Sequence, residues 1–157
     1  MGSRSKVSLA YIAGFLDGDG SLMFQIKKRK DGNKSRNRFM LTICFYQDSR
    51  HETPLFWIRD ILNIGYISRR NDGISELRIN GYKQVKEILE DLYPFIKFKR
   101  IQAKLLIESA CILQKKEYKE RDLRTLAKNI IRIQNENYRT RKKRTEKEIL
   151  KTLDLTP

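Results

Sequence analysis

The sequence predicts an α+β fold in which an antiparallel four-stranded sheet is covered by helices on one face. Three amphipathic helical segments alternate with two pairs of strand-like segments, and each pair is joined by a Gly-containing turn. The order helix, two strands, helix, two strands, helix (αββαββα) predicts this layered arrangement. A length of 157 residues with 39% hydrophobic content suits one domain. We assign 1–7 to an N-terminal tail and 8–157 to the domain, with a helical C-terminal extension over about 118–157.

The first helix carries two stripes. Leu9, Ile12 and Leu16 recur at helical spacing and are expected to face the core. Ser8 is a candidate N-cap and Gly18 a candidate stop, which places Asp19 just past the helix end. A second stripe consists of residues with little bulk or at the helix end: Ala10, Ala13, Gly14 and Asp17.

The small-residue stripe predicts a helix contact. A mid-helix glycine costs about 1 kcal/mol relative to alanine, so Gly14 is expected to have a packing reason. A second helix approaches such a stripe closely, and the simplest partner is the same stripe of a second chain on a two-fold axis. An ordinary amphipathic helix with an Asp-Gly turn is the alternative for this stripe taken alone.

Two hairpins follow from alternating polarity. Leu22, Phe24 and Ile26 predict one strand, and segment 38–45 predicts its partner across the turn at 30–34. Segments 65–70 and 74–79 flank Asn71-Asp72-Gly73 in the same way. A helix is predicted to begin at Thr53-Pro54, with Thr53 as the N-cap. Further helices are predicted around Val85 to Leu92, from Ile101 to Leu113 and from Leu123 to Ile133. A capping box at Thr145 to Glu148 predicts the start of the last helix.

The sheet face away from the helices is predicted to be polar. Its residue types include those that pair with base edges in the major groove of DNA, whereas a phosphate-binding surface is mostly Lys and Arg. A strand of roughly nine residues spans about 30 Å, close to one turn of B-DNA. An ordinary solvated sheet face is the alternative. The predicted face comprises Gln25, Lys27, Arg29, Arg38, Met40, Thr42, Ser68, Arg70, Glu76, Arg78 and Asn80.

The net charge of +15, from 34 Lys and Arg against 19 Asp and Glu, indicates a polyanionic partner. Charge alone leaves a ribosomal or general nucleic-acid-binding protein open. The two cysteines, Cys44 and Cys111, lack metal-site spacing, and the single His argues against a His-rich metal or base cluster. No apolar stretch approaches the roughly 18 residues of a membrane span and no signal peptide is evident, so an intracellular protein with no membrane partner is expected.

The segment Tyr11 to Ser21, with the core Ile12-Ala13-Gly14-Phe15-Leu16-Asp17-Gly18-Asp19-Gly20, resembles the signature of the LAGLIDADG homing endonucleases. The order of elements extends the resemblance to at least Gln102. We find one copy of the motif, which is typical of the homodimeric type. The resemblance implies a metal-dependent double-strand break in a long pseudo-palindromic DNA target, minor-groove cleavage with short 3′ overhangs, and a role in intron homing. It also implies that the motif helices form the dimer axis.

The same resemblance implies the active site. Asp19 and the carbonyl of Gly18 are assigned as metal ligands, and hard oxygen ligands suit Mg²⁺. Mn²⁺ is expected to substitute, and Ca²⁺ to support binding without cleavage. Gln47 is expected to hold water and Lys99 to stabilise phosphate charge or polarise the water network. Asp17 is read as a structural carboxylate at the helix end rather than a ligand.

Some interpretations stay open at this point. His51 is either a phosphate contact or a loop histidine, and the basic run 139–144 either grips the DNA backbone or is a solvated loop. A non-cleaving, intron RNA-binding maturase of the same fold and a non-cleaving DNA-binding regulator are the alternative functions. No small-molecule substrate is expected. The expected location is a chloroplast or mitochondrion in a eukaryote, and the cytoplasm in a prokaryote.

Overall fold

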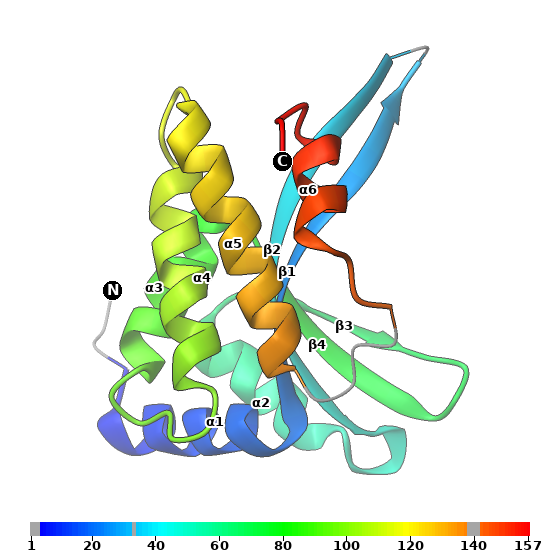
Figure 1. The fold of residues 1–157 in the computed structure, drawn as a ribbon. Helices are drawn as coiled ribbons and strands as arrows, with labels where there is room; N and C mark the ends of the chain where they lie inside the picture. Colours follow the sequence, from blue (N-terminus) through cyan, green and yellow to red (C-terminus); the bar gives the residue numbers. More distant parts are fainter. Residues whose placement is uncertain (1–3, 33, 138–141) are drawn as a thin grey trace.

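The computed structural model describes residues 4–32, 34–137 and 142–157. The elements follow the predicted αββαββα order and continue, as predicted, into three further helices in the described C-terminal part of the chain (Figure 1). Their bounds are α1 Lys6–Asp19, β1 Gly20–Asp31, β2 Lys34–Asp48, η1 Ser49–His51, α2 Thr53–Leu62, β3 Tyr66–Arg69, β4 Ile74–Asn80, α3 Tyr82–Leu92, α4 Arg100–Leu113, α5 Glu120–Glu136 and α6 Glu146–Thr152.

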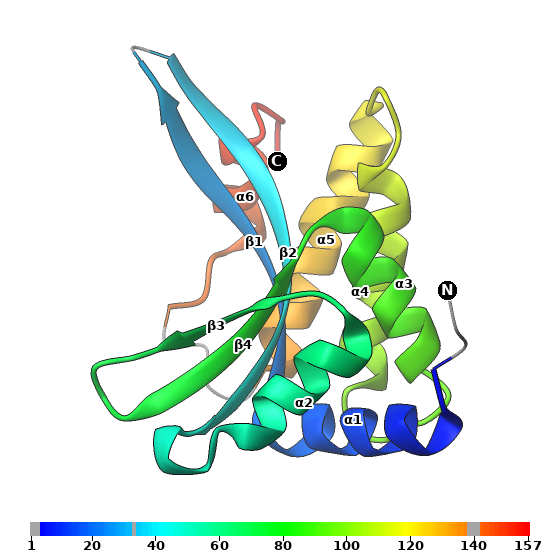
Figure 2. The same cartoon turned by 180° about the vertical axis from the view of Figure 1, so that it is seen from behind.

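The four strands form one antiparallel sheet in the order β1-β2-β4-β3, which confirms the predicted fold class. The β1-β2 hairpin is the longer one, and its far half extends beyond the end of β4 (Figure 2). The two tight turns use glycine where the backbone is left-handed, with φ of 61° at Gly32 and 80° at Gly73. Position 33 of the first predicted turn lies outside the described residues.

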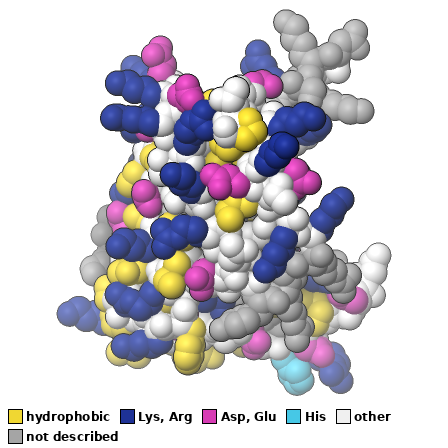
Figure 3. All heavy atoms as spheres, viewed as in Figure 1, with side chains coloured by type: hydrophobic (Ala, Val, Ile, Leu, Met, Phe, Trp, Pro, Cys, Tyr) yellow, Lys and Arg dark blue, Asp and Glu magenta, His cyan; other side chains and the backbone are white. Residues whose placement is uncertain are grey.

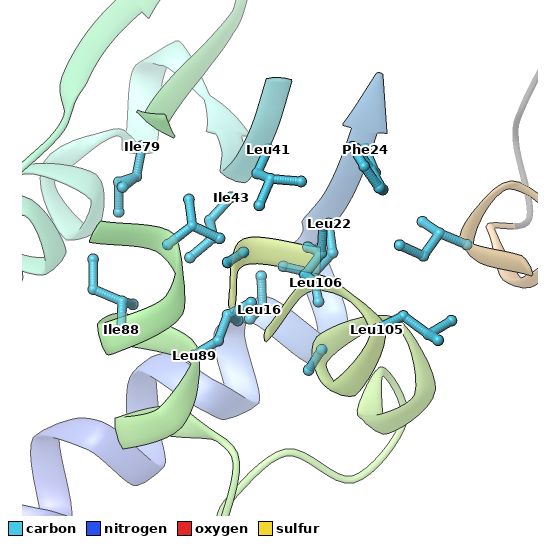
Figure 4. Close-up of a cluster of buried hydrophobic side chains, with 14 of the residues drawn as sticks. Leu16, Leu22, Phe24, Leu41, Ile43, Ile79, Ile88, Leu89, Leu105 and Leu106 are labelled. Atoms are coloured by element: carbon cyan, nitrogen blue, oxygen red, sulfur yellow. The ribbon is translucent and has the colours of Figure 1, made fainter. Parts of the chain in front are cut away.

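The helices bury one face of the sheet. The inward side chains of β1, β2 and β4 alternate along each strand and meet residues from α1, α3 and α4 (Figure 4). Leu16, Leu41 and Leu106 are all fully buried in this cluster. The same cluster continues to Ile149 and Leu150 in α6, so the C-terminal helices belong to the same core as the motif helix.

The C-terminal helices are also tied to the first hairpin by amide side chains. Asn137 donates from Nδ2 to the carbonyl of Leu22 at 3.1 Å, and Asn37 of β2 donates to the carbonyl of Thr152 at 2.7 Å. The Thr145–Glu148 capping box is present at the start of α6. Among the described residues, no helix is long and apolar enough to cross a membrane.

The start of α1 differs from the prediction. Ser5, not Ser8, is the N-cap, and its side chain accepts from the backbone N–H of Ser8. Arg4 fixes this position by donating to the carbonyls of Ile61 and Leu62 and to Asp91. Residues 4–7 are therefore part of the folded structure and not of a tail. The contacts of Arg4 decide which of the two serines, Ser5 or Ser8, caps the helix, and they join residues far apart in the sequence. Likewise Thr53 is the first residue of α2 and Glu52 its N-cap.

Glu52 joins α2 to the second hairpin. Its carboxylate, of which 15% of the side-chain surface is exposed, accepts from the guanidinium of Arg69 and from the hydroxyl of Ser75. The hydrogen bonds from Arg69 first, and then from Ser75, hold the pKa of Glu52 below its ordinary value of 4.5. The charged carboxylate therefore favours the folded state.

We predict that Glu52→Gln reduces the pH dependence of stability on the acid side. Because the folded pKa is depressed, the contribution of Glu52 is complete above 4.5 and is lost as the pH falls through the folded value. The difference in Tm between wild type and Glu52→Gln should be constant above about pH 5.5 and shrink toward about pH 3, measured by circular dichroism at one protein concentration.

Arg69→Met is the matched control, because it removes the main cause of the shift without touching the carboxylate. It should reproduce the weaker pH dependence. A Tm difference between wild type and Glu52→Gln that grows on acidification would contradict the assignment.

Candidate nucleic-acid interface and active site

The sheet face opposite the helices carries the predicted polar set. The register places Gln25 opposite Met40, Lys27 opposite Arg38, and Thr42 opposite Asn80. Because the strand residues of the hydrophobic core cluster have the other parity, these pairs point away from the helices. In β3, Ser68 lies opposite Glu76, and Arg70 follows directly after the strand. The face therefore gathers long polar side chains from all four strands.

Two members of this set do not fit the expectation of direct base contact. Thr42 is 0% exposed and Glu76 is 5% exposed in the chain. Thr42 donates to Oδ1 of Asn80 at 2.6 Å, and Glu76 accepts from Nε of Arg78 at 2.5 Å. Arg70 lies 3.7 Å from the same carboxylate. Both buried residues thus hold the partly exposed side chains beside them instead of presenting their own polar atoms.

The motif helix ends at the edge of this face. Gly18 and Asp19 are exposed in its last turn, so Asp19 lies within the helix and not just past its end as predicted. Asp19 has no hydrogen bond or salt bridge with the residues that the structure describes. β1 begins at the very next residue, Gly20, where an added Cβ would lie 2.8 Å from the carbonyl oxygen of Leu16. Only glycine allows the helix to continue into the strand at this point.

Asp17 is joined to the 97–99 segment by four hydrogen bonds, two of them with Lys99. The Asp17 carboxylate accepts from the backbone N–H groups of Lys97 at 2.6 Å, Phe98 at 3.2 Å and Lys99 at 3.1 Å. Nζ of Lys99 donates in return to the carbonyl oxygen of Asp17 at 2.6 Å. The structural role expected for Asp17 is therefore present, and it brings Lys99 to the end of α1.

The ammonium group of Lys99 is half-buried beside two carboxylates. Burial lowers the pKa of Lys99, while the charges of Asp17 and Asp19 oppose that shift. A partly desolvated cation at this position interacts more strongly with an anion than a fully solvated lysine does.

Asp19, Gly18 and Lys99 line one open cavity of roughly 1270 Å³ between the helix end, β1 and the C-terminal segment. Gln47 is not among the described residues that line it, although it stands near by. Gly20 pairs with Phe45, so Gln47 lies two residues further along β2, beside the end of α1. Its Oε1 accepts from the backbone N–H of Asp48 at 2.9 Å, which leaves the amide nitrogen of the side chain available as a donor.

The small-residue stripe on α1 is shifted from the predicted one. Ala13 is fully buried in its own core, and Asp17 is occupied by the 97–99 backbone, so neither is available to a second chain. Ala10 and Gly14 are exposed as predicted, and nothing lies within 4 Å of a Cβ built on Gly14. The exposed stripe at helical spacing consists of Val7, Ala10, Tyr11, Gly14 and Gly18.

Basic residues are not confined to the open sheet face. Lys and Arg side chains also spread over the face that carries the C-terminal helices, with Asp and Glu between them (Figure 3). Of the basic run 139–144, residues 139–141 lie outside the described residues, whereas Lys142 and Arg144 line the cavity that contains Asp19. His51 is exposed at the end of η1, next to an ion pair between Asp48 and Arg50 at 2.9 Å.

Several residues of the open face escaped the sequence analysis. Tyr46 and Ser21 are joined by a hydrogen bond of 3.0 Å, and Tyr66, at 53% exposure, lies opposite Arg78. Each has the same strand parity as the predicted set, so continuing the alternation to the strand ends identifies them.

An open polar sheet, a motif helix with an exposed acid at its end, and a lysine held against that end together define an endonuclease fold of the LAGLIDADG class. The chain belongs to this family: the model for LAGLIDADG endonucleases matches residues 12–108. It is 38% identical over 106 residues to DNA endonuclease I-CvuI of Chlorella vulgaris, and 33% identical over 104 residues to DNA endonuclease I-CreI of Chlamydomonas reinhardtii. These alignments cover 67% and 66% of this chain and 65% and 63% of the relatives, so less than two thirds of each relative is matched.

Solved structures extend the likeness over almost the whole chain. The crystal structure of I-CvuI in complex with the I-CreI target, with magnesium present and the DNA uncleaved, has a TM-score of 0.80 at 25% identity. It covers 95% of this chain and 94% of that chain. The archaeal intron-encoded endonuclease I-Vdi141I, solved with DNA, has the same fold, with a TM-score of 0.78 at 21% identity over 94% of this chain and 95% of that chain.

We predict that the two thiols differ in reactivity. Cys44 is fully buried on the sheet and donates from Sγ to Glu76 at 3.6 Å, and burial raises its pKa to about 12. Cys111 is exposed on α4. Because the thiolate is the nucleophile, iodoacetamide at about pH 8 should alkylate Cys111 alone in the native protein and both residues in urea.

Peptide mass spectrometry of the alkylated chain locates the label. Modification of Cys44 in the native state at a rate close to that of Cys111 would show that this part of the sheet opens readily.

Proposed function

We propose that this chain is a homodimeric, metal-dependent homing endonuclease that makes a double-strand break in a long, pseudo-palindromic DNA target. The observation that carries the proposal is the placement of Asp19 and Lys99 on one cavity at the end of α1, at the edge of the open sheet face. A binding protein has no physical need for a carboxylate aimed at phosphates. Family membership and the likeness to DNA-bound endonucleases support the same function.

The residues present fit a hard divalent cation. Asp19 offers an exposed carboxylate without a protein partner among the described residues, and Gly18 offers a backbone carbonyl beside it. No cluster of three or more His, Cys, Asp or Glu side chains suited to a metal lies within the described residues. Ligands from a second chain and from DNA phosphates therefore have to complete the site. We propose Mg²⁺, with Mn²⁺ as a substitute and Ca²⁺ supporting binding only; I-CvuI has been solved with its target in calcium.

Each side chain then has a distinct task. A bound divalent ion polarises the scissile phosphate and lowers the pKa of bound water. Asp19 binds that ion, Gln47 orients water with its amide nitrogen, and Lys99 stabilises negative charge on the phosphate from the end of α1. On the sheet, the exposed members of the predicted set contact bases, while Thr42 and Glu76 position Asn80, Arg78 and Arg70.

The dimer follows from the exposed stripe on α1. Two such helices approach closely along Ala10, Gly14 and Gly18 because these residues present almost no side-chain bulk. A two-fold axis there brings the two Asp19 carboxylates to one end of the interface. Two identical sheets on such an axis read two half-sites, which predicts a nearly palindromic target. A role in intron homing and a location in a chloroplast or mitochondrion stay predictions.

We predict that Asp19→Asn abolishes cleavage and preserves binding. Wild type incubated with a randomised duplex library and Mg²⁺ should yield specific cut ends on sequencing. Loss of the ligand charge should slow cleavage by at least about 1000-fold, with affinity for the selected target in Ca²⁺ unchanged within about threefold. Asp91→Asn is the matched control, because Asp91 pairs with Arg4 near the opposite end of α1. It should cut at the wild-type rate.

Specific binding of duplex DNA by wild type without any specific breaks would contradict the endonuclease hypothesis and favour a non-cleaving DNA-binding regulator. Preference for intron RNA over duplex DNA would favour the maturase. Cutting by Asp19→Asn at the wild-type rate would refute the assignment of the metal ligand.

We predict that Gly14→Leu yields a folded monomer. The single chain has room for the new side chain, since nothing lies within 4 Å of the added Cβ. A second helix packed closely against Gly14 would clash with the leucine. Light scattering after size exclusion should give half the wild-type mass, with an unchanged far-ultraviolet spectrum. Lys83→Leu, an exposed position on α3, is the control and should remain dimeric. A dimeric Gly14→Leu protein would place the interface elsewhere.

A further inference from the structure

We propose that Asp17 is a positioning residue for catalysis, which locks the 97–99 segment onto the motif helix and so holds the Lys99 ammonium at the helix end. The proposal rests on the proposed function of this site, because it assigns a role through Lys99. Asp17 itself is not a catalytic residue, since its carboxylate is turned to the backbone of its own chain.

The backbone of 97–99 explains why a carboxylate is needed. These residues precede α4, whose N-cap Lys99 makes no side-chain capping bond. The first N–H groups of a helix lack partners within the helix, and an anion there also benefits from the helix dipole. Asp17 supplies such an anion from another element. Its two oxygens accept from the N–H of the N-cap Lys99 and from the two N–H groups just before it.

A second bond runs in the opposite direction. The carbonyl of Asp17 lies in the last turn of α1, where carbonyl groups lack partners within the helix. Nζ of Lys99 donates to it at 2.6 Å. The same residue therefore fixes both the backbone and the side-chain tip of Lys99, which limits the positions that the ammonium can take.

The surroundings of the 97–99 segment show why it has to be held in place. Lys97 and Phe98, which directly precede Lys99, are both exposed, Phe98 to 84%, so the segment has little packing of its own. Without the Asp17 carboxylate, the three N–H groups of 97–99 would lose their acceptor and the backbone of Lys99 would no longer be held against α1, although the carbonyl that accepts from Nζ remains. A misplacement of about 1 Å at a reacting centre can cost about 100-fold in rate.

The test is a double-mutant cycle on the single-turnover cleavage rate with saturating target. We expect Lys99→Ala to lose about 100-fold to 1000-fold, and Asp17→Ala about 100-fold. If Asp17 acts through Lys99, adding Asp17→Ala to Lys99→Ala should cost less than about threefold more. Asp17→Asn keeps one oxygen acceptor and should recover part of the loss. Affinity for the target in Ca²⁺ should change little, so the effect lies in the rate and not in binding.

Arg4→Ala is the stability control, since it loosens α1 at its other end and should leave the cleavage rate within about twofold. Amide hydrogen exchange of the DNA-free protein, followed by NMR, gives a readout that does not need activity. The N–H groups of Lys97, Phe98 and Lys99 should be protected in wild type and should exchange at least about tenfold faster in Asp17→Ala.

The outcomes separate the two proposals. Unprotected amides at 97–99 in wild type, or protection that Asp17→Ala leaves unchanged, would overturn the lock itself. Protected amides with losses that multiply in the double mutant would overturn its action through Lys99. A wild-type protein that cuts no target overturns the proposed function and the catalytic role together, while the exchange data still decide whether Asp17 locks the segment.

Discussion

The packing of α1 across the sheet is the contact on which the rest of the structure depends. Leu9, Ile12 and Leu16 are buried against the strands, which fixes both the position and the rotation of the helix. That rotation leaves Ala10 and Gly14 exposed on one side. It also places Asp17 against the 97–99 backbone and Asp19 at the open end. One helix thus provides part of the core, the proposed dimer interface and the proposed site, and each use constrains the others.

The strand alternation has a similar double role. On one face it supplies the apolar side chains of the core, and on the other it supplies long polar side chains with fixed spacing. The hydrogen bond from buried Thr42 to Asn80 and the ion pair of Glu76 with Arg78 show that the polar face is itself organised. A side chain held by a neighbour loses less conformational freedom on binding, which favours a defined target over general affinity for phosphate.

Local patterns in the sequence predicted most of the fold, because helix and strand periods, turn glycines and the capping box are set by neighbouring residues. The errors lie where distant contacts decide. Arg4, bonded to the end of α2, moves the start of α1 from Ser8 to Ser5. Ala13 belongs to the same small-residue stripe in sequence but faces the core. Thr42 and Glu76 have the correct parity, yet their burial depends on cross-strand partners that alternation does not specify. For the site, Asp19 and Lys99 came from family resemblance, because nothing in local sequence links positions 19 and 99.

The absence of any linker between α1 and β1 has an evolutionary consequence. One extra residue in a helix turns everything after it by about 100°, and one extra residue in a strand exchanges its two faces. Under the proposed function, Gly20 therefore fixes the distance between Asp19 and the bases that the sheet would contact. Insertions and deletions near this junction are expected to abolish activity, whereas those in the hairpin turns are expected to be tolerated. Under the same function, new targets would arise by exchange of side chains along the strands, while the distance from the recognised bases to the cut would stay constant.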